Sequence, residues 1–160
     1  GLPLKIVGGG QDESRLRIDL PRNVQLLGPR AGPELVDLYS SCRALIFPGE
    51  EDFGIVPLEA QASGRPVIAF GKGGVTETVH PLGKTQAPTG VFFDEQSVAA
   101  LAGAVRRFEE HANAFDPAAA RANAARFDRP IFKEKIRAFL AKVTPEGRDR
   151  LPREAPRARA

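Results

Sequence analysis

Two short apolar runs, each followed by proline or glycine, constrain the fold of this chain most strongly. They are A-L-I-F at 44–47 and V-I-A-F at 67–70. Runs of this length and composition are typical of strands that are buried on both faces of a parallel sheet. Between them, Pro57 predicts the start of a short helix and Gly64 its end. The loop 48–56 is therefore expected at the carboxyl end of a strand, where open α/β sheets bind their ligands.

The same alternation of strands and helices extends over most of the chain. Further strands are predicted at 4–7, 24–27 and 90–93, and further helices begin at or near Pro33, Val75, Asp94, Asp116 and Arg129. The last helix carries an apolar stripe that we interpret as core, made of Phe132, Ile136, Phe139 and Leu140. We expect one α/β domain over residues 1–144, with a Rossmann-like parallel sheet flanked by helices. Residues 145–160 are expected to form a disordered basic tail.

Composition limits the classes of protein to which the chain can belong. Its 42% apolar and 27% charged residues are ordinary for a globular domain, and no apolar stretch is long enough for a transmembrane helix. The net charge of +3 is carried by residues 142–160, which hold six basic and three acidic side chains. The remainder is neutral, so we expect no nucleic-acid binding. The lone Cys42 excludes an intramolecular disulfide and favours a reducing, cytoplasmic location.

The loop 48–56 combines acidic side chains with a donor-rich backbone. It contains Glu50, Glu51 and Asp52, and a fourth acid, Glu59, follows on the predicted helix. Gly54 allows a ligand to approach the backbone closely. A natural anion site is expected from the N–H groups at the helix start, those of Ile55, Val56 and Leu58. Carboxylates beside such donors suit a ligand with an anionic part and several hydroxyls, and a nucleotide-sugar has both.

Other interpretations of the acidic and glycine-rich residues are less favoured. Glu59 could cap its own helix as the third helical residue, but this arrangement needs Ser or Thr at the N-cap, where Val56 is expected. The loop acids could bind a hard cation, but we expect no metal because the sequence has no D-x-D motif. The glycines at 8–10 do not continue as G-x-G-x-x-G, because Glu13 occupies the third position, so NAD binding is not expected. A tight turn and a ligand-facing loop are equally supported for them.

Two glutamates of the central stretch, Glu51 and Glu59, are separated by seven residues within the run E-D-F-G-I-V-P-L-E-A. This run resembles the E-x7-E motif of retaining GT-B glycosyltransferases of the GT4 family. Residues 23–28 are similar to the family's N-V-x-F-x-G strand, and residues 73–77 to its G-G-x-x-E turn. The resemblance extends from about residue 4 to residue 139. It implies the carboxyl-terminal, donor-binding half of a GT-B fold.

The resemblance also implies roles for individual residues. Glu51 would be the catalytic residue that contacts the donor hexose, and Glu59 would bind the ribose hydroxyls. The sugar and the diphosphate would be held by the backbone of Phe53, Gly54, Ile55 and Val56. The loops after the first two strands would face the donor through Gly8, Gly10, Gly28 and Arg30. For Arg30 a solvated side chain is the simpler interpretation. No cofactor is expected besides the donor substrate.

Two parts of the family pattern have no counterpart in these residues. One is an opening strand with a G-R…K segment, whose Arg and Lys hold the diphosphate. The other is an amino-terminal acceptor domain, which supplies the second half of the reaction cleft. We therefore expect a partial domain without its first strand, in which the leaving diphosphate lacks its main electrostatic stabilisation. Alone, the chain is expected to be inactive, to bind nucleoside diphosphate weakly and to self-associate through an exposed strand edge.

The implied parent enzyme is a hexosyltransferase that acts with retention on a sugar or lipid-linked acceptor. Within GT4, the run 48–71 most resembles bacterial mannosyltransferases of polysaccharide assembly, which favours GDP-mannose as donor. The parent enzyme would work in the cytoplasm, with peripheral association at the inner face of the cytoplasmic membrane. The rival hypothesis is a non-catalytic module that binds a nucleotide-sugar or docks a partner. A GT-B-like epimerase is a further alternative.

Overall fold

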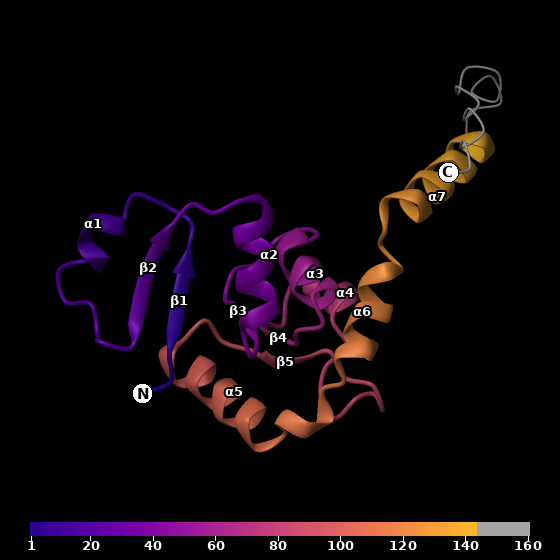
Figure 1. Cartoon of the computed structure of the whole chain (residues 1–160). Helices are drawn as coiled ribbons and strands as arrows, with labels where there is room; N and C mark the ends of the chain where they lie inside the picture. The colour runs from indigo at the N-terminus through magenta and orange to yellow at the C-terminus, as the bar shows by residue number, and fades with distance from the viewer. Residues whose placement is uncertain (144–160) are drawn as a thin grey trace.

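The computed structural model describes residues 1–143, and the predicted tail at 145–160 lies outside these described residues. The chain begins with β1 (Leu4–Val7), α1 (Glu13–Leu16), β2 (Val24–Gly28), α2 (Gly32–Ser41), β3 (Leu45–Phe47), α3 (Ile55–Ala62) and β4 (Val67–Phe70). It continues with α4 (Val75–Thr78), β5 (Gly90–Phe93), α5 (Val98–Glu110), a short 3-10 helix (Ala112–Ala114), α6 (Pro117–Ala125) and α7 (Arg129–Val143). Strands and helices thus alternate as far as α5, which is the predicted α/β order (Figure 1).

Strand pairing is parallel throughout the described residues. β1 pairs with β2, whereas β3, β4 and β5 form a second sheet in that order. The central strand β4 is buried along its whole length, as the continuous apolar run at 67–70 predicts. The predicted parallel α/β fold is therefore confirmed, and β1, β4 and β5 have the predicted bounds. The pairing, however, is divided between two sheets.

Side chains of β4 alternate between two apolar clusters, one on each face of the three-stranded sheet. On the face covered by α3, Val67 and Ala69 pack with Phe47, Ala60, Val75 and Val79. On the face covered by α5, Ile68 and Phe70 pack with Val91, Phe93, Ala104 and Phe108. Because helices close both faces, the loops at the strand ends are the places where this sheet can present polar groups to a ligand.

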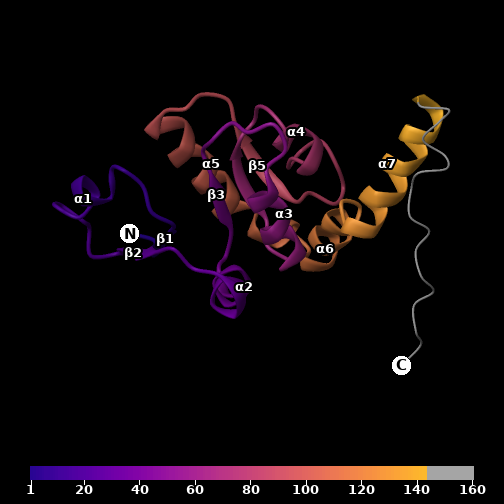
Figure 2. The ribbon, with the colours of Figure 1, turned by 90° about the horizontal axis from the view of Figure 1, so that it is seen from above.

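β1, β2 and α1 form a separate lobe, which α2 joins to the three-stranded sheet (Figures 1 and 2). All four residues of β1 are exposed, and its apolar members Leu4, Ile6 and Val7 have exposed fractions of 36%, 36% and 38%. A hollow of about 480 Å³ lies between this strand and α2, lined by Lys5, Asp37, Leu38, Ser40 and Ser41. The edge of β1 opposite β2 has no strand partner among residues 1–143. The strand predicted at 4–7 is thus present, but its side chains are exposed.

Helix α7 differs from its predicted environment. Its stripe was interpreted as core, but Phe132 is 62% exposed and Phe139 is 58% exposed, and none of its residues is buried. The interpretation was wrong because both faces of the three-stranded sheet are already occupied by α3 and α5. Figures 1 and 2 show α7 extending away from both lobes.

Two predicted helix starts have different outcomes. Asp116 accepts a hydrogen bond from the N–H of Ala118 (2.8 Å) and is the N-cap of α6, as its position before Pro117 predicts. Asp94 is not a cap. Ser97 takes that role for α5, because its hydroxyl accepts from the N–H of Ala100 (3.2 Å).

Candidate functional site

The segment 48–54, called the acidic loop below, leaves the carboxyl end of β3 and leads directly into α3 (Figure 1). A hollow of about 540 Å³ lies against it, lined by Glu50, Glu51, Asp52, Phe53, Gly54, Ile55 and Val56. The three acidic side chains are exposed at this surface. The structure therefore gathers Glu51 and the predicted backbone contacts at 53–56 around one concave surface, at the sheet edge where a ligand was expected.

The glycine turn at 73–74 supports this loop from behind. The N–H of Gly74 donates to the carbonyl of Glu51 (2.7 Å). A Cβ atom at Gly74 would lie 2.5 Å from the carbonyl oxygen of Asp52 and 2.5 Å from the Cα of Phe53. At Gly73, where φ is +69°, a Cβ atom would lie 2.5 Å from the carbonyl oxygen of Glu51. Glycine at both positions is thus what lets the turn pack directly on the loop backbone.

Helix α3 begins two residues earlier than predicted. Gly54 is its N-cap, in the left-handed region with φ +76° and ψ +77°, so the interpretation of Val56 as N-cap was wrong. The reason is that glycine adopts this conformation without strain and turns the chain into the helix at once. Ile55 and Val56 then occupy the first turn with free N–H groups, whereas Leu58 is the fourth helical residue, whose N–H is used inside the helix.

This start also removes the structural alternative for Glu59. A capping glutamate must be the third helical residue, and Glu59 is the fifth. Its carboxylate instead accepts a hydrogen bond from the hydroxyl of Tyr39 (2.9 Å between Oη and Oε2), which comes from α2. Burial and this contact with Glu59 both raise the pKa of the Tyr39 phenol above its ordinary value. Glu59 itself is exposed and does not line the hollow, but lies one turn along α3 from Ile55.

Tyr39 is a residue whose role the sequence motifs did not indicate, because it lies outside the E-x7-E run. The available signal was its hydroxyl, since a tyrosine on an apolar helix face needs a polar partner when it is partly buried.

The role of Phe127 was missed as well. Its ring meets that of Phe53 edge-on, with centroids 6.0 Å apart and ring planes at 68°. The Phe53 side chain is therefore engaged within the protein, and its backbone remains beside the hollow.

A buried hydrogen-bond network fixes α3 to the helices around it. The amide nitrogen of Gln61, on α3, donates to the carbonyl oxygen of Thr78 at the end of α4 (2.9 Å). Asn123, on α6, donates to the side-chain oxygen of Gln61 (2.7 Å) and to the same Thr78 carbonyl (2.8 Å). All three residues are at most 4% exposed. Buried polar groups that are fully paired make such a junction rigid.

The remaining predicted residues lie in the other lobe. The N–H of Gly8 donates to the carbonyl of Gly28 (2.9 Å), so these two glycines meet at the ends of β1 and β2. Gly10 lies at the entry to α1, where its carbonyl accepts from the N–H of Glu13 (3.2 Å). None of them lines the hollow at the acidic loop.

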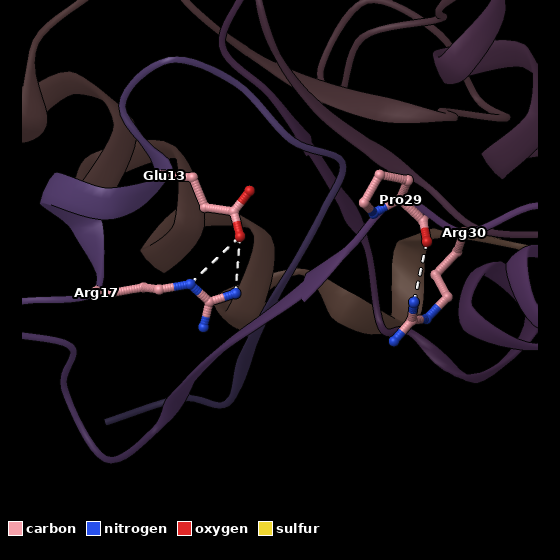
Figure 3. A network of polar contacts seen from close by, with 4 residues as sticks. All are labelled: Glu13, Arg17, Pro29 and Arg30. Atoms are coloured by element: carbon pink, nitrogen blue, oxygen red, sulfur yellow. Dashed lines mark hydrogen bonds and ion pairs between the residues drawn. The ribbon is translucent and has the colours of Figure 1, made fainter.

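Arg30 folds back on its own neighbourhood. Its guanidinium donates to the carbonyl of Pro29 (2.9 Å) and lies 3.4 Å from the carboxylate of Glu34. Figure 3 shows the hydrogen bond from Arg30 to Pro29 and, in the same view, the ion pair of Glu13 and Arg17, which have an N–O distance of 2.7 Å. Arg30 remains exposed, and no contact joins it to the acidic loop. Its structural surroundings agree with the simpler interpretation of a surface side chain.

Two further features bear on the wider chemistry of residues 1–143. None of the helices within residues 1–143 combines the length and the apolar character needed to cross a bilayer. In the same part of the chain, no group of three or more His, Cys, Asp or Glu side chains is arranged as metal ligands would be.

Residues 1–126 match the protein family described as "Glycosyl transferases group 1". Among curated relatives, a D-inositol 3-phosphate glycosyltransferase of Stackebrandtia nassauensis is 42% identical over an alignment of 89 residues that covers 49% of this chain and 20% of the relative. A GDP-mannose-dependent alpha-mannosyltransferase of Mycobacterium tuberculosis is 43% identical over 79 residues, which are 49% of this chain and 21% of the relative. The matched region thus spans about a fifth of the length of these relatives.

Solved structures resemble the chain over most of its length. Anabaena Alr3699/HepE in complex with UDP has a TM-score of 0.70 and 26% identity, and the match covers 88% of this chain and 41% of that one. Sucrose-phosphate synthase from Thermosynechococcus elongatus has a TM-score of 0.72 and 23% identity, over 89% of this chain and 38% of that one. At 23% identity, the second likeness is evidence for the fold alone.

Proposed function

Because the chain belongs to the glycosyl transferases group 1 family, we propose that it supplies the donor-binding half of an enzyme that transfers a hexosyl group from a nucleoside-diphosphate sugar. The family membership and the parallel α/β fold confirm the resemblance found in the sequence motifs. The matched region spans only about a fifth of the curated relatives, so the reaction of the whole protein is part of the proposal.

The observation that carries the proposal is the acidic loop, held beside a helix start. The hydrogen bond from Gly74 fixes the loop at Glu51, and the hollow in front of it is open to solvent. The free N–H groups of Ile55 and Val56 suit a diphosphate, whereas carboxylates suit sugar hydroxyls. A nucleotide-sugar presents both kinds of group within one molecule.

We assign the residues in the roles that the family pattern implies. Glu51 is the catalytic residue at the donor hexose, Glu59 binds the ribose hydroxyls, and the backbone of 53–56 holds the sugar and the diphosphate. The assignment of Gly8, Gly10, Gly28 and Arg30 to the donor rests on the family pattern alone, since these residues do not line the hollow.

For the donor we propose GDP-mannose, with transfer of mannose to a sugar or lipid-linked acceptor and retention at the anomeric carbon. Support comes from the Mycobacterium tuberculosis relative, which is described as GDP-mannose-dependent. The structure of Anabaena Alr3699/HepE holds UDP, so uridine nucleotides belong in the same test. A part in polysaccharide assembly, a cytoplasmic location and association with the membrane stay predictions.

One observation favours the second candidate, a module that binds nucleotide-sugars without catalysis. The residues that line the hollow include three acids and no Lys or Arg. Charge-assisted contacts to phosphate are the strong ones, and a leaving diphosphate needs them in the transition state. Binding without turnover by the chain alone is the outcome that this lining predicts.

The roles of the two glutamates can be separated by titration calorimetry of the 160-residue chain. We expect Glu59→Ala to weaken binding of both GDP and GDP-mannose by about 1.5–3 kcal/mol, because a charged acceptor for hydroxyls is lost. Glu51→Gln should weaken binding of GDP-mannose and leave GDP unchanged. The control is Glu95→Gln, an exposed acid in the loop before α5.

Each outcome bears on a different part of the proposal. Unchanged affinity in a folded Glu59→Ala protein would remove the ribose assignment. Equal weakening of both ligands by Glu51→Gln would show that Glu51 does not read the hexose. Failure of the wild-type chain to bind GDP, UDP or their sugars would overturn the proposed function.

A further inference from the structure

Tyr39 and Glu59 lie on different helices and are 20 positions apart in the sequence, yet their side chains are hydrogen-bonded at 2.9 Å. Among the described residues, Tyr39 is the single hydrogen-bond partner of the Glu59 carboxylate. The Tyr39 ring is partly buried and packs against the apolar cluster that contains Phe47 and Ala60. The hydroxyl is therefore held by a packed ring, while the carboxylate that it contacts is at the surface.

We propose that Tyr39 is a positioning residue, which holds the Glu59 carboxylate in the orientation that binds the vicinal hydroxyls of a ribose. This inference rests on the proposed function, in which Glu59 binds the nucleoside part of the donor. It adds a residue of α2 to the β3–α3 segment that carries Glu51 and Glu59.

The geometry of the contact leaves the carboxylate available to a ligand. Tyr39 uses only Oε2, and no contact within residues 1–143 uses Oε1. An ionised carboxylate has two oxygens and about four acceptor positions, so two hydroxyls of a ribose can still bind after one position is taken. The direction of the bond also suits this role, because the phenol donates and leaves the carboxylate as acceptor.

Holding Glu59 in place removes a cost that binding would otherwise include. An exposed glutamate has several side-chain rotamers, and fixing them on ligand binding costs free energy. A partner with a packed ring restricts these rotamers before the ligand arrives. The contact also ties the carboxylate to α2, the helix that follows the last residue of β2, Gly28, and the loop residue Arg30.

The test uses the 160-residue chain with GDP and 2′-deoxy-GDP as probes, and with UDP and 2′-deoxy-UDP as a second pair. Tyr39→Phe keeps the packed ring and removes only the hydroxyl, so its melting temperature should stay close to that of the wild type. We expect it to weaken binding of the ribonucleotide about five- to tenfold. The same substitution should have little effect on the 2′-deoxy probe, or on either probe when Glu59→Gln is already present.

A spectroscopic measurement tests the contact without any ligand. Tyr39 is the single tyrosine of the chain, which has no tryptophan, so the intrinsic emission comes from this residue. A carboxylate that accepts a hydrogen bond from a phenol quenches its emission. Glu59→Gln should therefore increase the emission, and Glu95→Gln should not.

The outcomes separate this inference from the proposed function. If the wild-type chain binds none of the ribonucleotides, the proposed function is wrong and the inference with it. If Glu59→Gln weakens binding and Tyr39→Phe does not, only the inference is overturned. Equal effects of Tyr39→Phe on ribose and 2′-deoxy probes, or an undiminished effect in the Glu59→Gln background, would show a general structural role for Tyr39 and also overturn it. Unchanged emission in Glu59→Gln would show that the contact is absent in solution.

Discussion

Gly74 sets the position of the acidic loop because nothing larger than hydrogen fits on its Cα. Its own backbone is ordinary for any residue, with φ −61° and ψ −22°. The requirement is therefore steric, because the loop backbone at Asp52 and Phe53 fills the space of a side chain. A single methyl group at residue 74 would be expected to move Glu51 and the first turn of α3 together.

We expect Gly74→Ala to destabilise the chain by about 1–3 kcal/mol, since overpacking forces backbone shifts of this cost. It should also weaken nucleotide-sugar binding, because the loop that carries Glu51 must move. Gly103→Ala is the matched control. Gly103 lies inside α5 with nothing within 4 Å of an added Cβ atom, so alanine there should stabilise the fold by about 0.4–1 kcal/mol. Urea unfolding of the wild type and the two variants measures both stability changes, and titration calorimetry measures the loss of nucleotide-sugar binding. Equal stability of Gly74→Ala and wild type would contradict the steric argument.

At the scale of elements, α3 depends on α4 and α6 for its orientation. Gln61 and Asn123 are buried amides whose hydrogen bonds cross between these helices. Arg126 extends the network toward the surface, with its guanidinium 2.9 Å from the Asn123 side-chain oxygen and 3.2 Å from Nε2 of His80. The helix that carries Glu59 is thus anchored on its buried face by polar groups with directional preferences, in addition to apolar contacts.

Removing one side chain of this network should destabilise the fold by more than the loss of its packing volume alone would. Asn123→Ala leaves the side-chain oxygen of Gln61 buried without its donor, which is expected to cost about 1–3 kcal/mol. Asn113→Ala, at an exposed position of the 3-10 helix, should change stability by less than about 0.5 kcal/mol. Denaturant unfolding of both variants is the measurement. Similar stability of the two would mean that the network contributes nothing beyond packing.

At the scale of the whole molecule, the described chain combines a covered three-stranded sheet with a strand, β1, that is exposed along its whole length. The three-stranded sheet has helices on both faces, whereas every residue of β1 is exposed. Unpaired strand edges with apolar side chains favour pairing with another chain. Apolar side chains of α7 add to the exposed surface.

We therefore expect the 160-residue chain to self-associate at micromolar concentrations, with the β1 edge as a contact. Ile6→Lys should shift the chain toward the monomer, because a lysine on an edge strand opposes pairing. Val98→Gln is the control, since Val98 is 87% exposed but isolated at the start of α5. Sedimentation velocity over a concentration series distinguishes the variants. A monodisperse wild-type monomer would contradict the expectation.

Much of this architecture is readable from short stretches of the sequence. The apolar run at 67–70 located β4, because a strand buried between helices needs apolar side chains on both faces. The strands predicted at 4–7 and 90–93 also have the observed bounds. The acidic loop was likewise placed at the end of β3 by the proline and glycine that follow the run at 44–47. The E-x7-E run, together with the motifs at 23–28 and 73–77, indicated the family, which the match over residues 1–126 confirmed.

Other features depend on how distant segments meet. The left-handed turn at Gly54 starts α3 two residues earlier than predicted. Tyr39 donates a hydrogen bond to Glu59, which is 20 positions away in the sequence, and Phe53 packs on Phe127, which follows α6. The stripe on α7 indicated an apolar face, but not that helices α3 and α5 already cover the sheet. A pattern of residues predicts the local backbone conformation and whether a side chain needs an apolar or a polar partner. Which group satisfies that need is determined by the path of the chain in space, because contacts between helices form only when the whole fold brings them together.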